Sequence, residues 1–139
     1  MKKALTLVLG ILCMTSVLYG QTNDSSDSSS SMNLNRTIHF ENDSNPEEIS
    51  ITIDPNTKLF ELMISSVVTT GKLTIELYDV KGVKQGNISV GTQLDADKKE
   101  RVNGNIRKSL KEPEAGIWTI KIIPTKANGS IQIQTTILN

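Results

Sequence analysis

Residues 72–82 read KLTIELYDVKG, and this stretch shows the pattern that decides the fold. Apolar Leu73, Ile75 and Leu77 alternate with polar residues, and the run ends at Gly82. Strict alternation places apolar side chains on one face of a β-strand and polar ones on the other. An aspartate followed three residues later by glycine is typical of a tight turn between antiparallel strands. The stretch therefore predicts a half-buried strand that enters a hairpin.

The same alternation recurs from Arg36 to the end of the chain. Apolar side chains occupy every second position in residues 38–40, 49–53, 60–64, 88–90, 118–122 and 131–137, with a looser pattern over 102–110. Turn signals separate the runs, at residues 54–56, 69–71, 81–82, 112–116 and 127–129. Seven or eight short strands, each with one buried and one wet face, predict an all-β antiparallel sandwich or barrel.

Two further stretches carry a resemblance to known domains. Residues 112–122 read EPEAGIWTIKI and residues 129–137 read GSIQIQTTI. A turn that ends in glycine, then tryptophan in an alternating strand, then a final alternating strand resembles the bacterial pre-peptidase C-terminal domains. It also looks like the P domains of subtilisin-type proteases. The resemblance covers residues 36–139 and implies a jelly-roll-like β-sandwich. Those domains accompany a protease, which this chain lacks, so the resemblance implies the fold and little about function.

The first 20 residues predict a cleavable signal peptide. Lys2 and Lys3 precede an apolar run over residues 4–18, and Gly20 is a small residue suited to the cleavage position. The run is shorter than the about 20 residues that a membrane span needs, so no transmembrane segment is expected after cleavage. Cys13 follows a leucine rather than a small residue, so we interpret it as part of the apolar run, with lipidation as the alternative.

The rest of the chain divides at residue 36. Residues 21–35 are rich in serine and poor in apolar side chains, which predicts a disordered leader, either a spacer or a tail with no role. Residues 36–139 form the expected sandwich domain. Removal of Lys2 and Lys3 leaves a net charge of about −2, which gives no field that attracts nucleic acid. Cleavage also removes the only cysteine, so the mature chain has no disulfide or thiolate ligand.

Catalytic residues are sparse. His39 is the only histidine, which excludes sites that need two. It falls on the polar side of its expected strand, so we interpret it as an exposed strand residue; the alternative is a general base in a small hydrolase. Trp118 alternates in phase with Ile120 and Ile122, so we expect it in the core rather than as a sugar-stacking platform.

Calcium is the one cofactor that the sequence suggests. Asp95 and Asp97, in the loop over residues 91–101, offer hard oxygen ligands, and Asp79 in the hairpin turn offers another. Because Lys98 and Lys99 adjoin the loop acids, the alternative is a set of solvated carboxylates with no cofactor.

A basic cluster is the second candidate binding feature. It comprises Lys98, Lys99, Arg101, Arg107, Lys108 and Lys111. Such a cluster suits an anionic polysaccharide, a lipid headgroup or an acidic protein. The alternative is a solvated charged face that discourages pairing at a sheet edge.

The leading hypothesis is an exported, non-enzymatic module, periplasmic or secreted, that binds or scaffolds a protein or glycan at the bacterial envelope. The second is a calcium-dependent module that binds carbohydrates or surfaces. The third is a small secreted hydrolase that rests on His39 and the loop acids.

Overall fold

The computed structural model describes residues 30–92 and 100–139, and every regular element within these ranges is a β-strand. Six strands follow one another along the chain: β1 (Ser31–Asp43), β2 (Glu47–Ile53), β3 (Leu59–Tyr78), β4 (Lys84–Gly91), β5 (Val102–Lys111) and β6 (Gly116–Leu138). All their pairings are antiparallel. The all-β antiparallel expectation is confirmed.

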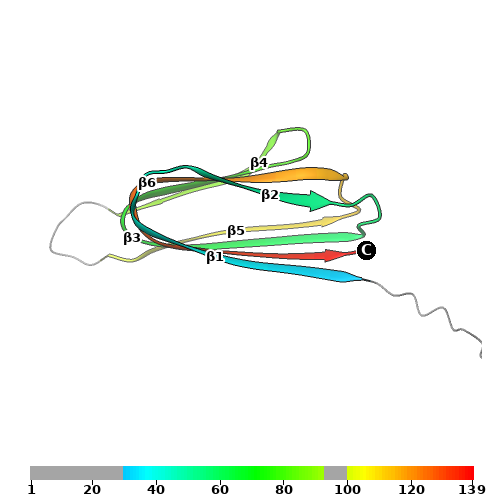
Figure 1. Cartoon of the computed structure of the whole chain (residues 1–139), viewed down its shortest axis with the longest axis horizontal. Helices are drawn as coiled ribbons and strands as arrows, with labels where there is room; N and C mark the ends of the chain where they lie inside the picture. Colours follow the sequence, from blue (N-terminus) through cyan, green and yellow to red (C-terminus); the bar gives the residue numbers. More distant parts are fainter. Residues whose placement is uncertain (1–29, 93–99) are drawn as a thin grey trace, which may run out of the picture.

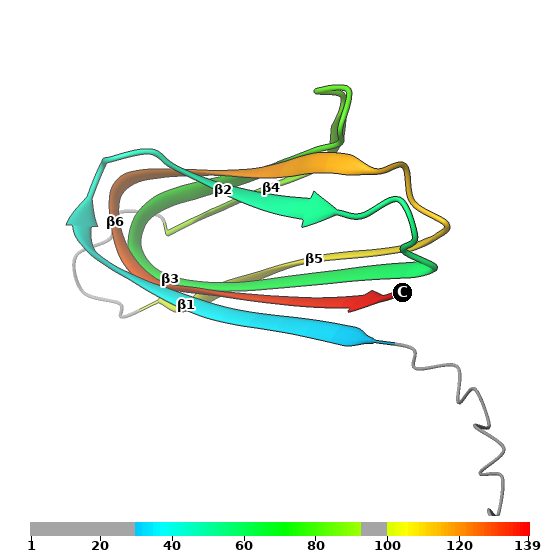
Figure 2. The same ribbon diagram turned by 45° about the vertical axis from the view of Figure 1, so that its right-hand side comes forward.

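Strands β3 and β6 form the frame of the molecule. They pair along nearly their whole lengths, from Leu59 opposite Leu138 to Tyr78 opposite Thr119. Figure 2 shows this two-stranded ribbon folded back on itself, so that its two halves lie in opposite layers. Each half pairs with two further strands and so forms a four-stranded sheet.

The two sheets take their strands from distant parts of the chain. In the first, which we call the β1 sheet, the order is β1, residues 127–138 of β6, residues 59–70 of β3, then β5. In the second, the β2 sheet, the order is β2, residues 116–122 of β6, residues 72–78 of β3, then β4. Figure 1 shows the two layers face to face. Two four-stranded sheets in this order form a jelly roll.

The strand count differs from the expected seven or eight for a specific reason. Two expected turns, at residues 69–71 and 127–129, are bends within the continuous strands β3 and β6. Gly71 (φ +77°) and Gly129 (φ +156°) allow both bends, because non-glycine residues rarely adopt such backbone angles. The register also shifts between Val68 and Lys72 at the fold. Eight segments therefore form six strands.

The core lies between the two sheets and follows the alternation in the sequence. Phe60, Leu62 and Ile64 of β3 point inward from the β1 sheet, and Leu73, Ile75 and Leu77 of the same strand point inward from the β2 sheet. Trp118 is only 4% exposed, as expected, and its ring centroid lies 5.5 Å from that of Phe60. An aromatic pair at this distance bridges the layers at the end remote from the bends.

The N-terminal edge of the domain lies earlier than the sequence predicts. β1 begins at Ser31, which pairs with Leu138 of β6. Residues 31–35, which were expected in the leader, therefore belong to the sheet. These residues lack a buried side chain, which is why an apolar pattern does not reveal them. Backbone pairing with β6 holds them in place instead. The expected signal peptide (residues 1–20) and most of the expected leader lie outside the described residues.

Candidate functional site

The outer face of the β1 sheet carries mainly amide and hydroxyl side chains. Cross-strand register places amide and hydroxyl residues in rows that run over all four strands. One row is Asn35, Gln134, Met63 and Arg107; the next, toward the bends, is Thr37, Gln132, Ser65 and Asn105. Flanking rows add Asn33, Thr136, Glu61 and Ser109 on one side and His39, Ser130, Val67 and Asn103 on the other. We call this surface the amide face.

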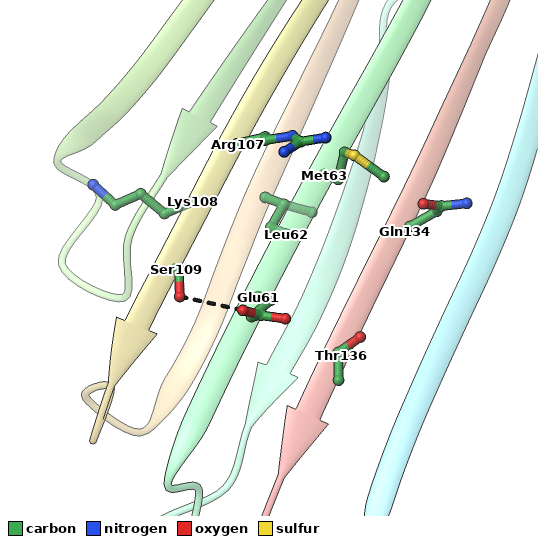
Figure 3. A pocket seen from close by; sticks show the side chains of 8 residues that line it. All are labelled: Glu61, Leu62, Met63, Arg107, Lys108, Ser109, Gln134 and Thr136. Atoms are coloured by element: carbon green, nitrogen blue, oxygen red, sulfur yellow. Dashed lines mark hydrogen bonds between the residues drawn. The ribbon is translucent and has the colours of Figure 1, made fainter.

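A depression of about 550 Å³ lies on the amide face. Its lining comes from Glu61, Leu62 and Met63 of β3, Arg107, Lys108 and Ser109 of β5, and Gln134 and Thr136 of β6. Figure 3 shows Met63, Gln134 and Arg107 in one row and the Ser109 hydroxyl directed at Glu61, with an Oγ–Oε1 distance of 3.5 Å. Its volume lies within the about 300–1,000 Å³ range of small-molecule sites.

The groups around this depression suit recognition of a polar partner. Gln134 offers an amide donor and acceptor, Thr136 and Ser109 offer hydroxyls, and Glu61 and Arg107 place an acceptor and a planar donor on neighbouring strands. Amides do not titrate near neutral pH, so they hold a ligand by hydrogen bonds without exchanging protons. Met63 adds an apolar contact in the centre of the row.

The outer face of the β2 sheet has a different chemistry. There, Lys84 pairs with Glu76, and the Lys121 Nζ lies 3.1 Å from the Glu48 Oε1. Both ammonium groups also lie over the Tyr78 ring, 5.6 and 5.3 Å from its centroid. The side chains of this face therefore satisfy one another. Among the described residues, no ion pair forms between side chains of the amide face.

Hydrogen bonding within the β2 sheet shifts several pKa values in the directions that ion pairing predicts. A hydrogen bond from Lys84, with a second from the Tyr78 hydroxyl, lowers the pKa of the Glu76 carboxyl. The same contact with Glu76 raises the pKa of Lys84. A hydrogen bond between Lys121 and Glu48 raises the pKa of Lys121. These groups remain charged over the physiological range.

Asp79 caps the hairpin turn between β3 and β4. Its Oδ1 accepts the backbone N–H groups of Lys81 and Val83, each at 2.9 Å, and its Oδ2 accepts the Gln85 amide at 2.7 Å. The Val83 hydrogen bond, followed by the Gln85 and Lys81 bonds, outweighs partial burial and lowers the pKa of the carboxyl. Because both oxygens are engaged, Asp79 stabilises the turn and is a poor calcium ligand.

The other calcium residues, Asp95 and Asp97, lie outside the described residues. Within residues 30–92 and 100–139, no group of three or more His, Cys, Asp or Glu side chains is arranged to hold a metal ion. Calcium binding stays a prediction. A rise in melting temperature with calcium, reversed by a chelator, would support it.

The members of the basic cluster that the structure describes lie on both sides of β5 or before it. Lys98 and Lys99 lie outside the described residues, and exposed Arg101 precedes β5. On β5, Arg107 and Lys111 project from the amide face, whereas Lys108 points to the interior side, where its Nζ lies 3.2 Å from the Gln85 Oε1. Strand alternation separates neighbours that the sequence places together. His39 is exposed on the amide face, as expected for the polar side of β1.

Both open sides of the sandwich carry an inward-pointing cation. Arg36 of β1 pairs with Glu47 of β2 across one side, and Lys108 of β5 contacts Gln85 of β4 across the other. Inward charges on edge strands discourage pairing with further chains. Of the basic cluster, Lys108 has this role, which is the alternative that the sequence left open: a charge that discourages pairing at a sheet edge.

The amide face has a signal in the sequence that charged clusters do not carry. In β1 and in residues 130–136, the positions between the core residues are mostly Asn, Gln, Ser and Thr rather than Lys and Glu. Only cross-strand register shows that these positions fall on one surface.

No protein-family model matches this chain, and no curated protein matches it in sequence. No helix in the described residues is long and apolar enough to cross a membrane. A pilus protein of Bacillus endospore appendages, described as disulfide-linked, has 15% identity, covers 94% of this chain and 96% of its own, and has a TM-score of 0.41. The latent dimeric PorU of Porphyromonas gingivalis has 6% identity over 78% of this chain and 13% of its own, with a TM-score of 0.44.

The VP2 subviral particle protein of infectious bursal disease virus has 14% identity over 94% of this chain and 40% of its own, with a TM-score of 0.36.

Proposed function

We propose that this chain is an exported, non-enzymatic jelly-roll module that binds or scaffolds a polar partner, protein or glycan, at the bacterial envelope, and that the amide face is its binding surface. The observation that carries the proposal is the depression on this face, with hydrogen-bonding groups from three strands around it. On the outer face of the β2 sheet, by contrast, Lys84 pairs with Glu76 and Lys121 pairs with Glu48.

The chemistry of the face supports binding rather than turnover. Its principal groups are amides and hydroxyls held on paired strands, which donate and accept hydrogen bonds from fixed positions. Sites on rigid strands are more exact than sites on loops, so their ordering costs little on binding. The apolar alkyl chain of Met63 supplies contact area beside the polar groups.

Export is the second part of the proposal, and it rests on the sequence of residues 1–20. A jelly roll without disulfides is compatible with export, because its core supplies the stability that small secreted domains otherwise obtain from cross-links. The resemblance of residues 72–82 and 112–122 to pre-peptidase C-terminal domains supports the sandwich fold of the proposed module and not its partner.

The test compares two amide-to-acid changes that preserve size. Gln134→Glu places a charge in the depression, and Asn56→Asp places one in the exposed turn after β2. Purified envelope glycans and envelope proteins are passed over the immobilised proteins. We expect retention that Gln134→Glu weakens and Asn56→Asp preserves. Equal retention by all three proteins, or turnover on a panel of hydrolase substrates, would contradict the proposal.

A further inference from the structure

A second cavity lies at the bent end of the sandwich, away from the amide face. Its volume is about 410 Å³, and it forms where the chain passes from one sheet to the other. Four segments meet there: the end of β1, the bend of β3, the residue after β4 and the bend of β6. Its lining comprises Asn42, Thr70, Gly71, Lys72, Thr92, Thr125, Lys126 and Asn128.

The charged residues that line this cavity are both basic. Lys72 of β3 and Lys126 of β6 both line the cavity, and none of its lining residues in ranges 30–92 and 100–139 is acidic. Both lysines are exposed, and neither takes part in an ion pair within the described residues. Asp43 follows Asn42 in the chain, but its Oδ1 accepts both the backbone N–H and the side-chain amide of Asn45. The cavity is therefore complementary to an anion.

Asn128 holds the walls of this cavity together. Its Oδ1 accepts the Asn42 backbone N–H at 3.0 Å, and its Nδ2 donates to the Thr70 hydroxyl. Its backbone carbonyl accepts the Thr69 hydroxyl at 3.2 Å. Because the Thr70 oxygen serves as an acceptor here, its own proton is directed to another partner. Thr92 and Thr125 add two more hydroxyls to the lining.

Two of the three non-glycine residues that adopt left-handed backbone angles in the described residues lie at this end, and the third is Glu112, after β5. Asn42 (φ +48°) and Lys126 (φ +46°) are non-glycine residues in the left-handed region, and both line the cavity. Backbone strain of this kind concentrates at binding sites, where the surrounding contacts maintain it. Here the Lys126 N–H donates to the Ser44 hydroxyl at 2.9 Å, which fixes the strained turn.

From these features we propose that the cavity binds an acidic sugar residue, whose anionic group contacts Lys72 and Lys126 and whose hydroxyls contact the threonine and asparagine side chains. Two lysines, together with the hydroxyls of Thr92 and Thr125, suit one negative group on a hydroxyl-rich ring. The sequence suggested an anionic ligand for the basic cluster at residues 98–111. The two lysines of this cavity lie outside that cluster and come from strands that are adjacent only in the fold. The site is separate from the amide face and does not depend on it.

The experiment uses the exported chain and three probes: digalacturonate, the neutral disaccharide galactobiose, and inorganic sulfate. Calorimetry at low salt measures each affinity. We expect digalacturonate to bind more tightly than the other two, because only it supplies both the charge and the hydroxyls. Lys72→Gln combined with Lys126→Gln should weaken it about tenfold, since two partly exposed charge contacts are lost.

The matched control combines Lys58→Gln with Lys111→Gln, which removes the same charge from exposed lysines at the other end of the sandwich. It should leave the affinity within about twofold, because screening weakens charges at this distance. Thermal melting establishes that both double variants are folded. Thr125→Val, at an exposed position, should weaken the binding of digalacturonate and leave the affinity for sulfate unchanged.

Several results would overturn the inference. They are the absence of binding, equal weakening by the two double variants, and tighter binding of sulfate or galactobiose than of digalacturonate. Amide NMR shifts locate the probe: changes at residues 70–72 and 125–128 support the cavity, and changes confined to the amide face contradict it. Loss of digalacturonate binding in Gln134→Glu would also contradict this inference while it supports the amide face. The two proposals therefore fail separately.

Discussion

Gly71 lies against the carbonyl oxygen of Lys126, so closely that a Cβ on Gly71 would stand 2.1 Å from that oxygen. This contact occurs where β3 and β6 bend together from one sheet into the other. Only a residue without a side chain permits the two backbones to approach in this way. The pair therefore marks the point on which the two-layer architecture depends.

We expect Gly71→Ala to destabilise the fold much more than Gly82→Ala. Both glycines have nearly the same backbone angle, φ +77° and φ +73°, so both substitutions carry the left-handed penalty of about 1–2 kcal/mol. A Cβ at Gly82 meets nothing within 4 Å, whereas one at Gly71 meets backbone that cannot move aside. Urea unfolding of the two variants measures the difference, which is the steric cost. Equal losses would show that the ribbon relaxes at its bend.

Trp118 tests the packing between the sheets. Its indole N–H is buried and finds no hydrogen-bond partner among residues 30–92 and 100–139, and a buried donor of this kind costs about 1–3 kcal/mol. We expect Trp118→Ala to lose about 3–5 kcal/mol of unfolding free energy. Trp118→Phe keeps an aromatic ring beside Phe60 and removes the unpaired donor, so we expect less than half of that loss. Chemical denaturation of both variants provides the measurement, and similar losses would contradict the explanation.

Acid sensitivity follows from Asp79. Hydrogen bonds to its carboxylate lower its pKa in the folded state below the reference value of 3.8. Its contribution to stability is therefore present above pH 3.8 and is lost as the pH falls through the lowered folded-state value. We expect Asp79→Asn to flatten the decline in melting temperature between about pH 4 and pH 2. Glu41→Gln, at an exposed position of β1, serves as the control and should leave the decline unchanged.

Arg36 tests the protection of the sheet edge. It lies on the interior side of β1, in line with exposed Met32 and Leu34, which are 65% and 43% exposed. Arg36→Leu would complete an apolar stripe along an edge strand, and such edges pair with other chains. We expect the average mass in light scattering to rise with protein concentration in this variant. Arg107→Leu, which removes a charge from the outer face of β5, should cause a smaller rise.

Local periodicity was enough to predict the secondary structure and most of the core. The inward residues of β2, β3, β4 and β6 are the apolar members of the alternating runs, because one sheet face is dry and the other is wet. The pattern misjudged the bends at Gly71 and Gly129, since a glycine beside polar residues has the same local signature in a bend as in a turn. It also missed residues 31–35, which backbone pairing holds without apolar burial.

The sequence by itself determined that alternating strands form an antiparallel sandwich, that Trp118 belongs to its core and that His39 is exposed. The tertiary structure decided which polar residues share a surface. The amide face draws on β1, β3, β5 and β6, and the second cavity joins Lys72 to Lys126 across 54 positions of the chain. The physical reason is that alternation specifies the side of a strand on which a residue lies, whereas pairing with distant strands specifies its neighbours.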